Sequence, residues 1–388
     1  MRWCIILDKV LLNCKYVTQN NGVWILKKGN IGIHDGIIVD ENMIDDVNEI
    51  VDMSGKILFP VLFNLHAHLG ESIFKNISGN DWTISRYLSY TNEFIKKQCR
   101  EEQERKWYES ALYTMQQMQQ NGIWGFCSAR SAPIYELLNM YTMAGYPIMN
   151  NEKLKHFQDG GINEFARYYK TFNNEKCSVG IFFHSLYMTD ASSLRFAQKC
   201  LEHGAEFISI HLSEDEVTRE REVKKYGKVP ALVLDEYKLL NEKTILTHCG
   251  FVSEFELELI SQRKSCIAIC PLSNKFLNTK VINPTILNQY GIKWSVCTDG
   301  LATGRTLSLL DQIKFFKRLY PEISNSELLN SVTVVPASMY GRGHYTGIIT
   351  KGTAAIFNQI NSNEEAIDKI LQSFIVNKNK MTIRDFSK

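Results

Sequence analysis

No apolar stretch in the chain approaches the roughly 18 residues that a membrane-spanning helix needs, so the sequence predicts no transmembrane segment. Charge of one sign is not in excess either, because 44 Lys and Arg stand against 42 Asp and Glu, for a net charge of +2. Such a balance offers no broad electrostatic surface for nucleic acid or for an anionic membrane. We therefore expect neither as a partner.

The ten cysteines include no Cys-x-x-Cys pair, and several, such as Cys127 and Cys249, lie in or beside short apolar runs. At the N-terminus, Arg2 and Lys9 flank only the brief apolar run 3–7, which is too short for a secretion signal. We therefore expect reduced thiols and a cytoplasmic protein.

What the chain does contain is ordinary globular composition, with 44% hydrophobic and 22% charged residues among 388, which excludes a disordered or fibrous chain. At roughly 150 residues per domain, this length favours two or three domains, or one large barrel with an appendage.

The first 55 residues are typical of short β-strands. Asp35-Gly36 lies between two apolar runs, which is a strong hairpin signal. The predicted strands are 5–12, 23–26, 31–33 and 37–39. The tail that starts at Gly347 has a similar pattern, and we expect it to complete a small sheet with them.

Between these segments, short apolar runs alternate with longer segments of helical periodicity. We predict strands at 57–65, 123–128, 146–149, 179–183, 207–210, 244–247, 266–270 and 293–298. Helices are predicted at 190–202 and 253–262, the second opening with Ser253 and Glu256 spaced as in a capping box. This alternation favours an α/β fold of the (β/α)8 barrel type, with a doubly wound open sheet as its rival.

Polar side chains gather where the predicted strands end. They are His66, His68, His184, His211, His248 and Asp299. A single histidine at a strand end is more often a hydrogen-bonded structural residue. Six such positions are harder to explain in that way, and in a barrel the carboxyl ends of the strands converge on one pocket. Their placement therefore favours the barrel and predicts a functional site at that end.

A metal ion fits the residue types at these positions. His66 and His68 are two residues apart, so in an extended chain their imidazoles lie on the same side. His211 and Asp299 complete a nitrogen and oxygen ligand set for zinc or a similar divalent ion. Because the set has no thiolate, we expect a catalytic site in which the metal lowers the pKa of bound water and holds hydroxide for attack.

Glu214 lies three residues after His211, where it can reach the metal-bound water and carry a proton to the leaving group. The alternative is an acidic residue at a helix start, because Glu214, Asp215 and Glu216 form a cluster that suits a helix N-terminus. His248 is expected in the same pocket, either orienting water or polarising substrate, or else acting as a second metal ligand.

Five motifs, taken in order, carry a resemblance to a known family. They are His66-Ala-His68, His211-Leu-Ser-Glu214, Leu246-Thr-His248-Cys, Cys270-Pro-Leu-Ser-Asn274 and Cys297-Thr-Asp299-Gly. The ordered set resembles the amidohydrolase superfamily, in the branch that holds cytosine, guanine and adenosylhomocysteine deaminases and chlorohydrolases. The resemblance covers almost the whole chain.

The resemblance implies a barrel domain at 56–345 and a β-sandwich built from 1–55 and 346–388. It implies one metal ion held by His66, His68, His211 and Asp299. In that branch, Asp299 also takes a proton from the water, Glu214 shuttles protons to the substrate and His248 stabilises the hydroxide. Members of the superfamily commonly form homodimers, so a homodimer is expected here.

The number of metal ions and the substrate contacts also follow from the resemblance. Binuclear members carry a lysine at the end of the fourth strand, where this chain has His184. A single metal is therefore favoured, zinc before iron, although the ligand set accepts both. His184 and Tyr187 match a His-x-x-Tyr signature that contacts substrate in the deaminase branch.

Two further side chains are candidates for substrate binding. Trp82 lies on the long 70–100 insertion, which would arch over a barrel mouth or else form an outer helix. Arg130 follows the second barrel strand and could hold an anionic or carbonyl group, or else form a surface salt bridge.

We therefore predict a mononuclear metal-dependent hydrolase that removes ammonia from an aminated heterocycle, such as a purine, pyrimidine, pterin or adenosine derivative. A nucleoside is disfavoured, because Glu93 falls out of register with the glutamate that binds ribose hydroxyls in nucleoside-type members. One alternative is a related hydrolase that releases chloride or an alkylamine, or opens a cyclic amide. An alternative of another class is a metal-binding or ligand-binding protein without turnover.

Overall fold

The computed structural model describes residues 5–40, 44–148, 160–342, 344–376 and 382–387. The chain divides into two compact units. One comprises the described residues of Met1–Phe63, Gln119–Trp124 and Glu322–Lys388, and the other comprises Asn64–Met118 and the described residues of Gly125–Pro321. The division into a catalytic barrel domain at 56–345 and a β-sandwich at 1–55 plus 346–388 stays a prediction.

The strands whose ends carry the candidate site residues form an eight-stranded sheet. Its order is strictly sequential, from β6 to β13, and the ladders from β7 to β13 are parallel. The strands are β6 (Leu62–Asn64), β7 (Ile123–Ala129), β8 (Tyr141–Ile148), β9 (Cys177–Phe183), β10 (Ile208–Leu212), β11 (Thr244–His248), β12 (Cys266–Ile269) and β13 (Trp294–Val296). A doubly wound sheet would reverse its strand order part-way. The fold is therefore the predicted (β/α)8 barrel.

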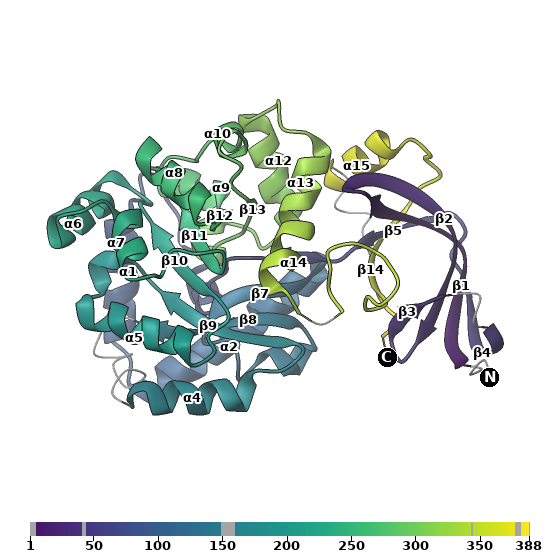
Figure 1. The fold of residues 1–388 in the computed structure, drawn as a ribbon, viewed down its shortest axis with the longest axis horizontal. Helices are drawn as coiled ribbons and strands as arrows, with labels where there is room; N and C mark the ends of the chain where they lie inside the picture. Colours follow the sequence, from purple (N-terminus) through teal and green to yellow (C-terminus); the bar gives the residue numbers. More distant parts are fainter. Residues whose placement is uncertain (1–4, 41–43, 149–159, 343, 377–381, 388) are drawn as a thin grey trace. The chain divides into compact units, whose positions relative to one another are not determined.

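Helices lie outside these strands (Figure 1). They include α4 (Gly161–Phe172), α5 (Ala191–Glu202), α6 (Glu216–Tyr226), α7 (Pro230–Glu236), α8 (Glu254–Gln262), α9 (Pro271–Phe276), α10 (Pro284–Gln289), α11 (Leu301–Gly304) and α12 (Leu309–Leu319). Two of them confirm predicted helices. The Asp190 side chain caps α5 by accepting the backbone N–H of Ser193, and Ser253 and Glu256 form the predicted capping box of α8.

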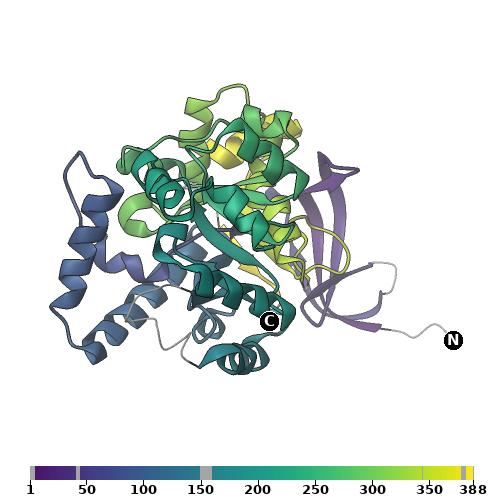
Figure 2. The same cartoon turned by 60° about the vertical axis from the view of Figure 1, so that its left-hand side comes forward.

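The long insertion after β6 folds into the 3-10 helix η2 (Leu69–Phe74) and the helices α1 (Ile84–Lys96) and α2 (Arg100–Gln120). Figure 2 shows α1 and α2, in dark blue, as a layer outside the strands. The insertion thus forms helices, and its Trp82 and Tyr87 pack against Leu277 and Ala302, which follow the carboxyl ends of β12 and β13.

Two predicted barrel strands have different bounds in the structure. The run 57–65 is two strands, because β5 (Lys56–Pro60) pairs with β1 in the other sheet and Pro60 has no N–H to continue a ladder. The prediction 146–149 found only the end of β8, because Gly145 interrupts the apolar run. A Cβ on Gly145 would lie 2.5 Å from Phe182 Cβ, so the close strand packing requires glycine. Met149 lies outside the described residues.

The terminal segments form a seven-stranded sheet in the order β15-β14-β5-β1-β2-β3, with β4 paired to β1. Its strands besides β5 are β1 (Ile5–Asn20), β2 (Val23–His34), β3 (Ile37–Val39), β4 (Ile44–Asp52), β14 (Ile356–Asn361) and β15 (Thr382–Asp385). The tail thus completes the sheet, as predicted, through the antiparallel pair of β14 and β5. The helices α13 (Asn325–Val332), α14 (Val334–Tyr340) and α15 (Ile367–Val376) belong to the same unit.

Within this sheet, β1, β2 and β4 depart from the prediction. The predicted strands 23–26 and 31–33 are one strand, β2. β1 continues to Asn20 across an irregularity between Leu11 and Cys14, where the apolar alternation breaks. β4 was not predicted, because its sequence, Ile-Asp-Asp-Val-Asn-Glu-Ile-Val-Asp, is rich in Asp and Asn, which strands disfavour. Its parallel ladder to β1 nevertheless places it in the sheet.

Side chains join the two ends of the barrel's strand order. Asn64, at the end of β6, donates from Nδ2 to Thr298 Oγ1 at 2.6 Å and accepts the backbone N–H of Thr298 at 3.1 Å. The backbone N–H of Asp299 donates to the carbonyl of His66 at 3.3 Å. The junction of β6 and β13 thus depends on one buried amide, directly below the predicted metal ligands.

Replacing Asn64 with Ala is expected to lower the stability of the protein, because it leaves the buried N–H of Thr298 without its acceptor, while the Thr298 hydroxyl keeps the Asp299 carbonyl as its acceptor. The cost is about 2 kcal/mol, since one buried unsatisfied group costs about 1–3 kcal/mol. For a chain of this size it corresponds to about 2 °C in the thermal midpoint. Differential scanning calorimetry against the exposed control Asn76→Ala measures it, and equal midpoints for the two variants would refute the role of Asn64.

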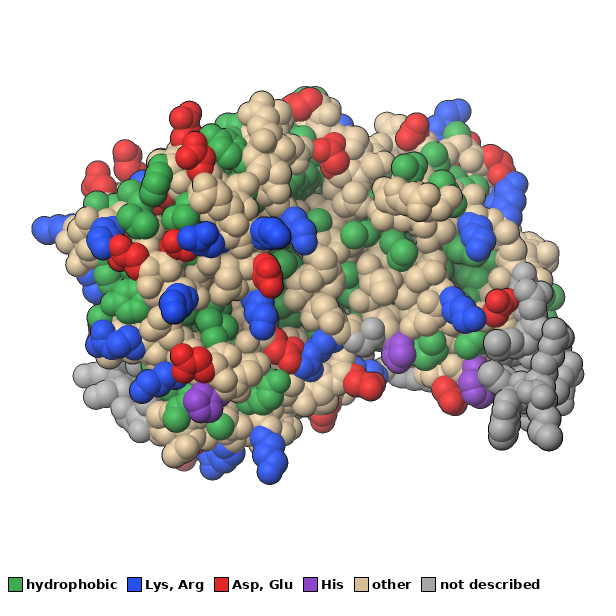
Figure 3. All heavy atoms as spheres, viewed as in Figure 1, with side chains coloured by type: hydrophobic (Ala, Val, Ile, Leu, Met, Phe, Trp, Pro, Cys, Tyr) green, Lys and Arg blue, Asp and Glu red, His purple; other side chains and the backbone are tan. Residues whose placement is uncertain are grey.

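No helix among the described residues has both the length and the apolarity to cross a membrane. On the face drawn in Figure 3, Lys and Arg side chains are interspersed with Asp and Glu rather than gathered into a field of one sign. This distribution agrees with the small net charge of the sequence.

Candidate active site

The predicted site residues follow the carboxyl ends of several barrel strands. His66 and His68 come just after β6, His211 lies in β10, and Asp299 follows β13. The backbone at three of these ends is left-handed, with φ of 71° at His248, 62° at Asp299 and 46° at Ser213, which precedes Glu214. Such a conformation costs about 1–2 kcal/mol at a non-glycine residue. The fold therefore holds these strand ends in strained turns, as is common at functional sites.

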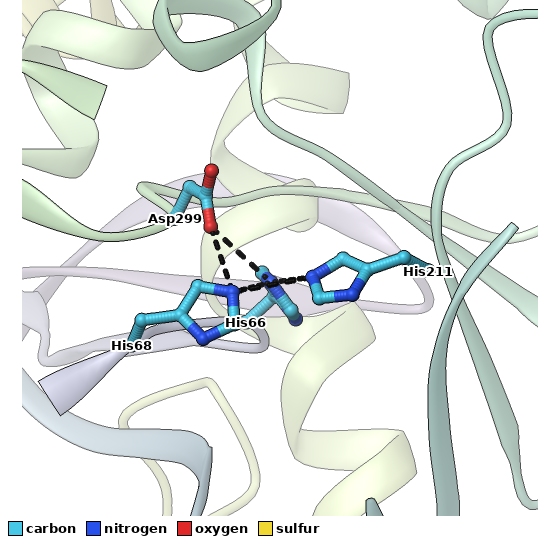
Figure 4. A group of neighbouring side chains, drawn as sticks. All are labelled: His66, His68, His211 and Asp299. Atoms are coloured by element: carbon cyan, nitrogen blue, oxygen red, sulfur yellow. Dashed lines mark hydrogen bonds and ion pairs between the residues drawn. The ribbon is translucent and has the colours of Figure 1, made fainter. Parts of the chain in front are cut away.

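Three imidazoles and one carboxylate meet at a single point (Figure 4). The Nε2 atoms of His66, His68 and His211 are 3.1–3.2 Å from one another. Asp299 Oδ1 lies 3.4 Å from His66 Nε2 and 3.1 Å from His68 Nε2. Ligands about 2.0–2.1 Å from a tetrahedral zinc ion are about 3.3 Å apart, so this cluster has the dimensions of a metal site.

Hydrogen-bond partners on the outer side of His66 and His211 orient the Nε2 atoms of these rings toward the cluster. His211 Nδ1 lies 2.6 Å from the His184 carbonyl, and His66 Nδ1 lies 3.1 Å from Thr247 Oγ1. A ring whose Nδ1 donates to a carbonyl presents an unprotonated Nε2, which is the form that binds metal.

The carboxylate of Asp299 is oriented in the same way. Its Oδ2 accepts hydrogen bonds from Ser273 and Thr303, while Oδ1 has no hydrogen-bond donor among the described residues and faces the imidazoles. One oxygen is therefore anchored and the other is left for a cation. The residues present thus fit a divalent metal ion.

The electrostatics of the cluster also favour a cation. Burial lowers the pKa of His66 to about 4, so that ring is neutral. Burial also opposes charge on His68, but the carboxylates of Glu71 and Asp299 outweigh it and raise the pKa to about 9. Burial opposes charge on Asp299, but the neighbouring imidazoles of His66 and His68 outweigh it and hold the pKa of this carboxyl well below its usual range. The site therefore attracts positive charge.

Glu214 and His248 face each other beside the cluster. His248 Nε2 lies 3.4 Å from Glu214 Oε1, and its Nδ1 lies 3.3 Å from Asn274 Oδ1. Burial raises the pKa of Glu214 well above its usual value, and the charges of Asp299 and Asp215 add to this. A carboxyl that keeps its proton near neutral pH is suited to act as a general acid.

Two alternatives from the sequence bear on these residues. Asp215, not Glu214, caps α6, because its side chain accepts the backbone N–H of Thr218. Glu214 is buried instead of lying at a solvated helix start. His248 also groups with His66 and Cys270, with ligand atoms within 4.8 Å of one another, so its role as a second metal ligand stays open.

Several supporting residues had no predicted role. Ser273 and Asn274 belong to the Cys270-Pro-Leu-Ser-Asn274 motif, which was noted in the sequence, and they hold Asp299 and His248. Thr247 had no such signal. Asn64, directly before the Leu65-His66 segment, joins β6 to the Thr298 segment.

Glu71 is the strongest site residue without a predicted role. Burial raises its pKa to about 7, with His68 acting against this and Asp299 adding to it. The buried Tyr87 hydroxyl lies beside it. A Cβ on Gly300 would come 1.9 Å from Glu71 Oε2, so the glycine after Asp299 makes room for this carboxyl.

His184 reaches the site, directly after β9. Its ring centroid lies 5.0 Å from that of His211 and 6.3 Å from that of Tyr187. Burial lowers its pKa to about 4, so the ring is neutral and can accept or donate a hydrogen bond. This position agrees with the expected substrate contact, which stays a prediction.

The structure does not bring Trp82 and Arg130 to the metal cluster. Trp82 packs in an apolar group with Phe74, Tyr87 and Leu277, and its Nε1 donates to the Ser78 carbonyl. Arg130 pairs with Glu104 at 2.9 Å and stacks over Trp107. The contact of Arg130 corresponds to the surface salt bridge given as its alternative, whereas Trp82 is buried in an apolar group.

The family model of the amidohydrolase family matches residues 57–385. The chain belongs to the amidohydrolase family. The match includes every candidate ligand, and it confirms the resemblance drawn from the five motifs. The strand order and the terminal sheet agree with this amidohydrolase assignment.

Relatives of this amidohydrolase include two archaeal enzymes. One is a 5-methylthioadenosine/S-adenosylhomocysteine deaminase from Pyrococcus furiosus, 26% identical over 86% of this chain and 82% of its own. The other is a 5'-deoxyadenosine deaminase from Methanothermobacter thermautotrophicus, 25% identical over 79% of this chain and 73% of its own. Among solved structures, an adenosine deaminase from Xanthomonas campestris with bound zinc superimposes with a TM-score of 0.86, at 16% identity, over 99% of this chain and 92% of that one.

Proposed function

We propose that this amidohydrolase is a deaminase that exchanges the amino group of an aminated heterocycle for oxygen and releases ammonia. The observation that carries the proposal is the pair of Glu214 and His248 beside the four-residue cluster of metal ligands. A protein that only binds a ligand does not need a buried carboxyl at that position, because burying a polar group costs stability. The names of the two archaeal relatives support the same reaction.

In the proposed mechanism, His66, His68, His211 and Asp299 hold one divalent ion. That ion would lower the pKa of a water molecule, so that Asp299 could take a proton from it while its oxygen adds to the ring carbon that bears the amino group. Glu214 gives its own proton to the adjacent ring nitrogen and passes the proton that left the water to the amino group, which leaves as ammonia. The last proton of the water returns to Glu214 as the C=O bond forms. His248 keeps Glu214 in place through its Nε2, while Asn274 fixes the imidazole from the other side.

For the substrate, we propose an adenosine derivative or a related aminopurine, since both archaeal relatives are named for adenosine-type compounds. His184 and the neighbouring Tyr187 are the proposed contacts on one side of the ring, and Glu71 accepts hydrogen bonds on another. Glu93, an exposed residue of α1, is not part of this assignment. Release of chloride or an alkylamine from a similar ring is the alternative reaction.

Zinc is the ion that we propose, in agreement with the nitrogen-rich ligand set and with the zinc bound to the Xanthomonas enzyme. A cytoplasmic homodimer stays our expectation for the assembly, with 56–345 as the catalytic domain.

A panel of aminated purines, pyrimidines, pterins and adenosine derivatives tests the proposal. Protein of known zinc content is expected to release ammonia from an adenosine derivative, measured by a coupled glutamate dehydrogenase assay. Chloride or alkylamine release from halogenated and alkylated analogues is followed in parallel by chromatography. Fully metallated protein that releases none of these products would contradict the proposal and favour a protein without turnover.

A further inference from the structure

Glu222 is a buried acid of α6 that the mechanism does not use. Its side chain is 1% exposed, and its Oε1 accepts the backbone N–H of Leu186 at 3.0 Å. The backbone N–H of Tyr187 also stabilises the carboxylate. Leu186 and Tyr187 begin the 3-10 helix η4 (Leu186–Met188), which starts two residues after His184. A single carboxyl therefore receives the first N–H groups of the segment that carries the proposed substrate contacts.

Two further residues of α6 bind the same segment. Lys225 Nζ donates to the Tyr187 carbonyl at 3.0 Å and also to the Thr189 carbonyl. The Tyr226 hydroxyl donates to the Thr189 carbonyl at 2.9 Å. The last turns of α6 thus fix both ends of η4, and Glu222 is the buried member of the group.

The other end of α6 is tied to the catalytic side. Asp215, the cap of α6, comes directly after Glu214. Arg219 donates to Ser213 Oγ at 3.2 Å and pairs with Glu256 at 2.6 Å, and Glu256 belongs to the capping box of α8. One helix therefore connects the segment of Glu214 with the segment of His184 and Tyr187.

We propose that Glu222 is a positioning residue that sets the place of His184 and Tyr187 relative to Glu214. The inference rests on the proposed function insofar as it assigns these two residues to the substrate. Glu222 touches no reacting atom and acts through the backbone of η4. Its loss is therefore expected to weaken substrate binding rather than the proton transfers of Glu214.

The chemistry of Glu222 indicates the matched variant. Burial raises its pKa to about 8, against the effect of the Leu186 and Tyr187 N–H groups. What η4 needs is an acceptor oxygen rather than a charge, and a glutamine has the same reach and the same acceptor. Glu222→Gln should therefore preserve the arrangement, whereas Glu222→Ala removes the acceptor. Glu220→Ala, at an exposed position on the same helix, is the control.

The first measurement is hydrogen exchange of the 184–190 segment in the metal-loaded protein, read by mass spectrometry. Glu222→Ala is expected to exchange at least about tenfold faster there, the equivalent of one lost hydrogen bond. Glu222→Gln and Glu220→Ala should match the wild type. Unchanged exchange in Glu222→Ala, or a Gln variant as fast as the Ala variant, would overturn the proposal. This readout needs no substrate, so it stands even if no compound releases ammonia and the proposed function fails.

The second measurement is the split between KM and kcat on the best substrate of the panel. We expect Glu222→Ala to raise KM about tenfold with kcat within about threefold, which is the pattern of lost binding. A fall in kcat with unchanged KM would overturn the positioning role. If Glu222→Ala does not fold, the same two measurements on Glu222→Asp test the proposal. Its carboxyl is one methylene shorter and should raise both KM and the exchange rate, and wild-type values would count against the proposal.

Discussion

Glu214→Gln is expected to reduce turnover by about a thousandfold while the protein keeps its metal ion and its fold. Glutamine has the same size but cannot give up a proton, and positioned proton transfer contributes about 10²–10⁴ to a rate. Burial raises the pKa of Glu214 well above its usual value, which favours the protonated form that a general acid needs. The measurement is kcat from ammonia release, with metal content from plasma mass spectrometry.

Glu216→Gln is the matched control for this variant, since Glu216 belongs to the same acidic cluster but is exposed at the start of α6. It should keep wild-type kcat. If Glu214→Gln were as active as this control, Glu214 would have no part in proton transfer. Loss of metal from Glu214→Gln would instead show that Glu214 helps to hold the ion.

His66→Ala is expected to lower the metal affinity by more than about a hundredfold, which exceeds the usual effect of losing an outer partner of a ligand. His66 is buried and its Nε2 lies within 3.4 Å of His68, His211 and Asp299, so its removal leaves three of the four ligands. The measurement is zinc retained after dialysis against a weak chelator. Ammonia release should be lost in proportion.

The exposed His203, at the end of α5, provides the control, and His203→Ala should retain its metal. A His66→Ala variant with a full metal complement would remove His66 from the ligand set. The thermal midpoint of the metal-free variant separates loss of the ion from loss of the fold.

The barrel and its site were predictable because both depend on local sequence. Apolar runs mark strands wherever they fold, and a polar residue at the end of such a run must lie near the barrel mouth. The structure accordingly brings together His66, His68, His211 and Asp299. The pairing of Glu214 with His248 follows from the same logic, since they lie at the ends of neighbouring strands.

What the sequence could not show depends on contacts between distant segments. Trp82 could line the pocket or pack among helices, and the contact that fixes its place is with Phe276 of α9, nearly two hundred residues away. The role of Arg130 was equally ambiguous in the sequence, and its contacts with Glu104 and Trp107 of α2 show a structural role. Glu222 gave no signal, because its partners are backbone atoms of another segment.

The contacts of Asn64 with Thr298 are coupled to metal binding. Asn64 fixes Thr298, and the next residue, Asp299, is both a candidate ligand and a donor to the His66 carbonyl. An ion that binds His66 and Asp299 therefore closes the same junction that Asn64 closes. By linkage, metal binding stabilises the closed junction by the same free energy by which the closed junction strengthens metal binding. Zinc loading should slow the opening of the barrel between β6 and β13, and a looser junction should release zinc more readily.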